Sequence, residues 1–168
     1  MGGEGGWKGV VEPDINPVGR SGISVPPPVI YLVALLVGLG LDHLWPTAPF
    51  SARWGYVAGA VLIILPIVIM PPVLIRFRRA GTPFVVWKTA SALITDGPYR
   101  FSRNPTYVSL TLLYVGLGVV LNTVWVLLLV IPVLLVMHFG VVLREERHLG
   151  AAFGEEYVRY KSAVRRWL

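Results

Sequence analysis

Long apolar runs alternate with short polar stretches along the chain. Four of them are long enough to be considered as membrane spans, at residues 28–45, 54–76, 105–121 and 124–143. A helix crosses a hydrocarbon layer about 30 Å thick with roughly 17 to 25 mainly apolar residues. We therefore expect an all-α fold, an integral membrane bundle of about four transmembrane helices.

The link between the last two runs is very short. It consists of Asn122 and Thr123, which suit a tight polar turn. So short a link forces the two helices to lie side by side and antiparallel. The start of the third run and the end of the fourth should therefore meet at the same end of a helical hairpin.

Polar segments flank the apolar runs. Residues 1–27 contain Gly, Pro and charged residues and no long apolar stretch, which predicts a mostly disordered tail. Residues 28–168 should form one domain. Within it, residues 144–168 follow the last span, and Gly150 and Gly154 should weaken helical structure there enough to kink it.

The segment 144–168 is amphipathic. Its apolar residues recur at spacings of three or four, which places them on one helical stripe; they are Leu149, Phe153, Tyr157, Tyr160, Val164 and Trp167. A basic amphipathic helix next to a membrane span is typical of the membrane interface. We expect such a helix here, along the membrane surface or packed beneath the bundle.

The positive charges give an orientation. All of the 15 lysines and arginines except Arg53 lie in the tail, in the loop between the second and third spans or at its edges, or after the fourth span. Four spans put these three regions on one side of the membrane. The positive-inside rule makes that side cytoplasmic, so both termini and the polar chemistry should face the cytoplasm.

The amino-acid composition limits the classes of function that the protein can have. Hydrophobic residues make up 55% of the chain and charged residues only 14%, whereas soluble domains carry about 25% charged residues. The net charge of +6 flanks apolar runs, which favours anionic lipid headgroups over nucleic acid as the partner. The absence of cysteine excludes disulfides, thiolate metal sites and a cysteine nucleophile.

The three histidines, His43, His138 and His148, lack the spacing of metal ligands, so we expect no metal site. His138 lies inside the fourth run. A polar residue inside a span is a functional candidate by default, although a lone histidine can also simply hydrogen-bond to a neighbouring helix.

Two polar clusters are candidates for chemistry. The first is residues 96–107, a turn-rich stretch that enters the third span, and the second is residues 144–148, where the fourth span ends. The hairpin should bring them together on one face of the membrane. Taken separately, they could be a basic membrane-flanking loop and a set of local Arg–Glu pairs. Adjacent carboxylates at a membrane edge also suit a cationic ligand, such as an ammonium or a sulfonium.

The order of these motifs resembles a known family. The matching residues are Gly81-Thr82-Pro83, Gly97-Pro98-Tyr99-Arg100, Arg103-Asn104-Pro105, Tyr107, Glu145-Glu146, Leu149, Phe153-Gly154, Tyr157, Tyr160 and Arg165. Over about residues 54–166 the chain resembles the isoprenylcysteine carboxyl methyltransferase family, to which the phospholipid N-methyltransferases are related.

The resemblance implies a membrane-bound methyltransferase that uses S-adenosyl-L-methionine and acts on a lipophilic small molecule or lipid. It places the cofactor at the cytoplasmic end of the helices. It implies that the cofactor is bound by Gly97, Tyr99, Arg103, Asn104, Pro105, Tyr107, Glu145 and Glu146. Arg144, orienting an anionic group of the substrate, and Glu145 would be the catalytic residues.

The chain departs from the family at two places. Asn104 stands where members often have histidine, so a proton-transfer role there is not expected. Val108 and Ser109 follow the motif tyrosine, where a small residue is usual.

Two alternatives also remain. One is an NADPH-dependent reductase of the sterol-reductase type, which resembles this family in architecture. The other is a non-catalytic membrane protein of the same fold.

Overall fold

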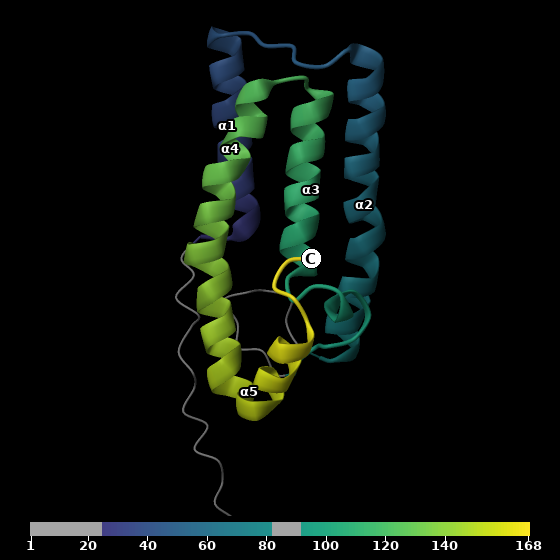
Figure 1. Cartoon of the computed structure of the whole chain (residues 1–168), viewed down its shortest axis with the longest axis vertical. Helices are drawn as coiled ribbons and strands as arrows, with labels where there is room; N and C mark the ends of the chain where they lie inside the picture. The colour runs from purple at the N-terminus through teal and green to yellow at the C-terminus, as the bar shows by residue number, and fades with distance from the viewer. Residues whose placement is uncertain (1–24, 82–91) are drawn as a thin grey trace, which may run out of the picture.

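The computed structural model describes residues 25–81 and 92–168, and within these ranges the chain is helical without strands. The elements are α1 (Pro27–Leu44), α2 (Ala52–Arg79), the short 3₁₀ turn η1 (Gly97–Arg100), α3 (Pro105–Val120), α4 (Val124–Leu135), the π-helix η2 (Val136–Val142) and α5 (Leu143–Ala163). Helices α1 to α4 run along the long axis of the molecule, and α5 folds back below them (Figure 1). Most of the predicted tail, Lys88 and the Thr82-Pro83 dipeptide lie outside the described residues.

The prediction of apolar helices is confirmed, and their count is three to four. Helix α1, helix α2 and the continuous helix from Val124 are long and apolar enough to cross a membrane. Helix α3 is also apolar but has only 16 residues. The helices fit a multi-pass membrane protein.

Helix α2 is longer than its apolar run. It starts at Ala52 and continues through three arginines to Arg79, whereas the apolar run predicted residues 54–76. Cations in a last turn interact favourably with the negative end of the helix dipole. Helical structure therefore continues past the point at which hydrophobicity ends.

The hairpin is confirmed in its geometry. Asn122 adopts a left-handed backbone with φ 56°, and the Thr123 amide donates to the Gly118 carbonyl at 3.1 Å. The Asn122 side chain also exchanges two hydrogen bonds with the backbone of Phe50. These bonds tie the hairpin turn to the link between α1 and α2.

The last apolar helix continues directly into the C-terminal segment. Helix α4 passes through η2 into α5 without a break, and the direction changes only at Gly154, with φ 52° and ψ −125°. Of the two glycines expected to kink this segment, Gly154 does so, because its backbone conformation is unfavourable for residues with a side chain. The helix ends at Ala163, so Val164 and Trp167 are not part of the helical stripe that the sequence predicted.

The buried core lies between α1, α3 and α4. Tyr31, Tyr114, Val126 and Met137 are among its members. Outward-facing leucine, isoleucine and valine side chains on α1 and α2 stay widely exposed in the isolated chain. This is the pattern of a bundle whose outer face is solvated by lipid rather than by water.

Helices α2 and α3 are in very close contact through two glycines. A Cβ atom added to Gly59 would lie 2.5 Å from Val120 Cγ2 and 2.9 Å from the Gly116 carbonyl oxygen. A Cβ on Gly116 would in turn meet Ile63 at 2.9 Å. Small residues at such a crossing let two backbones approach, which is a main source of helix association in membranes.

We predict that Gly59→Ala lowers the free energy of unfolding by about 1–3 kcal/mol, the usual cost of overpacking. The matched control is Gly40→Ala in α1, where an added Cβ meets nothing within 4 Å. The control should be neutral or slightly stabilising, because alanine favours helix over glycine. Unfolding of both variants in detergent measures the difference, and equal stabilities would contradict the close α2–α3 contact.

Candidate functional site

Four segments meet at the end of the bundle where α3 begins. They are the turn of residues 97–104, the first turn of α3, the first turns of α5 and the chain after Ala163. The sequence predicted the meeting of the first three from the hairpin. The fourth returns to the lower end of α3 after the bend at Gly154 (Figure 1).

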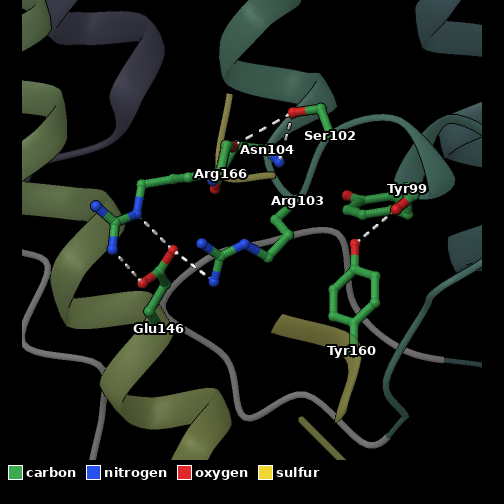
Figure 2. A network of polar contacts seen from close by, with 7 residues as sticks. All are labelled: Tyr99, Ser102, Arg103, Asn104, Glu146, Tyr160 and Arg166. Atoms are coloured by element: carbon green, nitrogen blue, oxygen red, sulfur yellow. Dashed lines mark hydrogen bonds and ion pairs between the residues drawn. The ribbon is translucent and has the colours of Figure 1, made fainter. Parts of the chain in front are cut away.

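The carboxylate of Glu146 lies between two guanidinium groups (Figure 2). Arg166 donates to both carboxylate oxygens, from Nε at 2.8 Å and from Nη2 at 2.9 Å. Arg103 Nη1 lies 3.1 Å from Glu146 Oε1. The side chains of Arg103 and Glu146 are each only 8% exposed, so this ion triad contains a buried pair, to which the partly exposed Arg166 is added.

The triad determines the protonation state of Glu146. Burial alone would raise the pKa of this carboxyl, but the hydrogen bonds from Arg166 and the charge of Arg103 outweigh it and hold the pKa below its ordinary value. Glu146 is therefore ionised at neutral pH. Its negative charge is compensated by two positive charges within the protein.

Backbone hydrogen bonds hold the chain after α5 against the turn before α3. The Arg103 amide donates to the Arg165 carbonyl at 3.0 Å, and Asn104 Nδ2 donates to the Arg166 carbonyl at 2.9 Å. Ser102 supports Asn104 by accepting a hydrogen bond from its amide at 3.1 Å. The side chain of Asn104 thus has a positioning role that needs no titrating group.

Glu145 has a different environment. Tyr107 donates its hydroxyl proton to Glu145 Oε2 at 2.8 Å, and within residues 25–81 and 92–168 no cation forms an ion pair with Glu145. Burial raises the pKa of Glu145, and the neighbouring charge of Glu146 adds to this, although the Tyr107 bond opposes it. The two adjacent glutamates therefore have pKa values displaced in opposite directions.

Two tyrosines flank the triad. Tyr160 donates to the backbone carbonyl of Tyr99 at 2.8 Å (Figure 2). Burial raises the pKa of the Tyr99 hydroxyl well above its ordinary value, and the nearby Glu145 charge adds to the effect. Tyr99 thus stays protonated and can donate a hydrogen bond to a ligand.

The structure brings most of the predicted site residues together. Those near one another around the triad are Tyr99, Arg103, Asn104, Tyr107, Glu145 and Glu146. Pro105 is buried where α3 starts. The position suits a residue without an amide donor.

Two of the predicted site residues, Gly97 and Arg144, are not part of this group. Gly97, with φ 60°, packs against the guanidinium of Arg76, which pairs with Asp96 at 2.9 Å. Its role in the described structure is to permit that turn. Arg144 is exposed on α5, so its predicted role toward a substrate stays a prediction.

Arg166, which contributes the strongest contacts to Glu146, was not among the site residues predicted from the sequence. Helical periodicity could not locate it, because the helix ends at Ala163 and the following residues turn back. The available signal was an arginine just after an amphipathic helix that carries a buried glutamate without a balancing charge. This signal does not show toward which part of the fold the arginine points.

We predict that Glu146→Gln lowers the free energy of unfolding by on the order of 3 kcal/mol, because it leaves Arg103 buried without its counter-charge. The matched control is Glu155→Gln, an exposed glutamate on the same helix, which should change stability little. Denaturant unfolding in detergent measures both. A loss no larger than the control's would show that the triad does not hold the site together.

We predict the opposite behaviour for Glu145→Gln. A carboxyl whose pKa is raised on folding loses stability as pH rises from the ordinary value of 4.5 through its folded pKa. Glutamine has no such titration and can still accept the Tyr107 hydrogen bond. The variant should therefore gain stability relative to the parent chain as pH rises through this window, as unfolding midpoints at several pH values would show. A constant difference across the window would contradict the raised pKa.

Comparison with known proteins places this arrangement in a family. A stretch of 62 residues, 37% of this chain, is 42% identical to an uncharacterized protein of Haemophilus influenzae (strain ATCC 51907 / DSM 11121 / KW20 / Rd), of which it covers 98%. Residues 54–156, more than half of the chain, match the phospholipid methyltransferase family. The match contains the α2–α3 contact, the turn before α3 and both glutamates. With apolar helices of membrane-spanning length and a polar site at one end of them, the chain belongs to the phospholipid methyltransferase family.

Proposed function

We propose that this protein is a membrane-embedded methyltransferase that uses S-adenosyl-L-methionine and methylates a lipophilic acceptor. Family membership supports methyl transfer. The observation that carries the proposal is that, within the described residues, no cation pairs with the carboxylate of Glu145, whereas the neighbouring Glu146 is neutralised by two arginines. It leaves one carboxylate for a cationic ligand, and a sulfonium cofactor with an amino group is such a ligand.

The residues present fit the cofactor at two points. Glu145 suits its positive groups, because the only polar contact of this carboxylate within the described residues is the Tyr107 hydroxyl. Arg103 Nε is buried and has no hydrogen-bond acceptor within the same part of the chain. A buried donor without an acceptor is costly, and a ligand carboxylate would satisfy it through a charge-assisted bond.

The aromatic residues complete the proposed cofactor site. Tyr99 and Tyr107 approach it from the turn and from α3. A tyrosine ring can support a sulfonium or an adenine through its face. Gly97, Asn104 and Pro105 would contribute by setting the backbone path of the turn, which agrees with their contacts in the structure.

When bound, S-adenosyl-L-methionine supplies an electrophilic methyl group. The chain would then have to align the acceptor with that group and exclude water, because orientation is the main requirement of an in-line transfer. Glu145 is our candidate for taking a proton from the acceptor, at a carboxylate oxygen. A raised pKa makes it a better base than an ordinary carboxylate. Arg144 is our candidate for orienting an anionic group of the acceptor.

We also propose that the site faces the cytoplasm. The described arginines at the end of α2 and around the site lie at one end of the bundle, whereas Arg53 lies at the other. This distribution follows the positive-inside rule. It would let a water-soluble cofactor enter from the cytoplasm while a lipid acceptor enters from the bilayer.

We predict that S-adenosylhomocysteine raises the unfolding midpoint of the purified protein in detergent. A ligand at 100 times its dissociation constant stabilises the folded state by about 2.7 kcal/mol. Glu145→Gln should abolish the shift without unfolding the protein, and the exposed Glu156→Gln is the control that should keep it. NADPH should give no shift.

Each result that contradicts this prediction favours a different conclusion about the ligand. Protection by NADPH instead would favour a reductase. Protection by neither compound would favour a non-catalytic relative. A shift retained in Glu145→Gln would show that a cofactor binds but not through this carboxylate.

A further inference from the structure

An apolar groove of about 440 Å³ lies beside the candidate site. Its walls come from α3, from the end of α4, from η2 and from the last residues of the chain. Among the side chains that line it are Val108, Leu112, Leu134, Leu135, His138 and Trp167. Its volume lies in the lower part of the range of about 300–1,000 Å³ for small-molecule sites.

The imidazole of His138 is a polar group of the groove that is left for a ligand. The hydroxyl of Thr111, which also lines it, is engaged with the Tyr107 carbonyl and the Tyr31 hydroxyl, each at 2.8 Å. His138 has ring contacts with Phe139 and Trp167, with centroids 4.8 and 6.3 Å away. Within the described part of the chain, no group forms a hydrogen bond with its imidazole.

His138 lies inside the π-helix η2. A π-helical turn is rare and often marks a functional site, because its wider winding displaces side chains from their α-helical positions. In a membrane span, an ionisable side chain without a partner is itself costly. The two features occur at the same residue, which faces the groove.

The groove runs from the candidate site toward the middle of the bundle. Val108 follows Tyr107 directly, and His138 lies about two helical turns before Glu145 on the same continuous helix. Leu112 and Leu134 lie farther from the site along their helices. The polar end of the groove is therefore the end nearer to the carboxylate proposed to act on the acceptor, and its apolar end is farther from it.

We infer that this groove binds the single apolar chain of the methyl acceptor and that the imidazole of His138 hydrogen-bonds to an uncharged polar group, such as a neutral amine, at the head of that chain. This inference rests on the proposed function. No charged side chain is among the residues that line the groove, and an apolar wall disfavours the charged form of an amine. The same wall therefore favours the form of an amine that has a free electron pair for the methyl group.

His138 then determines which acceptors bind and takes no part in the methyl transfer itself. An acceptor with a hydrogen-bonding head should bind better than the same chain without one, because only the former satisfies the imidazole. Loss of a buried hydrogen bond of this kind lowers affinity by about tenfold.

The experiment uses the full chain in detergent and two photoreactive probes. One is hexadecylamine with a diazirine near the tail, and the other is the same chain ending in a methyl group. Labelled peptides are identified by mass spectrometry. We expect labelling at Leu112 and Leu134, and about tenfold stronger labelling by the amine. His138→Phe should make the two probes equal, and His138→Gln, which can still hydrogen-bond, should restore part of the difference.

Leu134→Trp fills the groove and should abolish labelling at Leu112. The matched control is Ile131→Trp on the same helix, where the side chain is 60% exposed and does not line the groove. The unfolding midpoint of each variant shows that it is folded. Labelling spread over the outer faces of α1 and α2, or unaffected by Leu134→Trp, would overturn the inference, as would equal labelling by both probes in the parent chain.

S-adenosylhomocysteine binding, measured on the same samples, separates this inference from the proposed function. Cofactor binding without groove labelling overturns the inference alone. Selective groove labelling without cofactor binding supports the lipid site and contradicts the proposed methyl transfer.

Discussion

The ion triad around Glu146 joins three parts of the chain that are distant in sequence. Glu146 belongs to α5, Arg103 to the turn before α3, and Arg166 to the segment after α5. Because Arg103 and Glu146 are largely removed from water, neither can lose its partner cheaply. The hydrogen bonds from Arg103 and Asn104 to the backbone of residues 165 and 166 repeat the same connection. The geometry of the candidate site therefore depends on this one electrostatic contact.

The triad also explains how two adjacent glutamates can have different roles. Successive residues on a helix point about 100° apart, so Glu145 and Glu146 face different surroundings. Glu146 faces two arginines and is neutralised within the protein. Glu145 faces Tyr107, and within the described residues no cation forms an ion pair with it. In the sequence motif the two glutamates form one unit. In the structure, Glu146 holds the segments of the site together, whereas Glu145 is a candidate for binding a ligand.

Much of the fold could be predicted from hydrophobicity, because apolar runs and a two-residue turn at Asn122-Thr123 leave few arrangements. The meeting of Tyr107 with Glu145 follows from that hairpin. The role of Arg166 could not be predicted, since it depends on a reversal at Gly154 and on the helix ending before Val164. The π-helix around His138 was also beyond pattern analysis, because a single wider turn leaves no mark on an apolar sequence. In both cases, long-range packing rather than local preference decides the conformation.

The order of synthesis gives the position of Arg166 a consequence for membrane insertion. The ribosome makes the turn before α3 about 60 residues before it makes Arg166. All the apolar helices are therefore made before the triad can form. Glu146 is made about 20 residues before Arg166, and until Arg166 follows, Arg103 is its only partner in the triad. Insertion of the bundle and completion of the polar site are thus successive events, and the bundle must be held by apolar and glycine-mediated packing before the charges are joined.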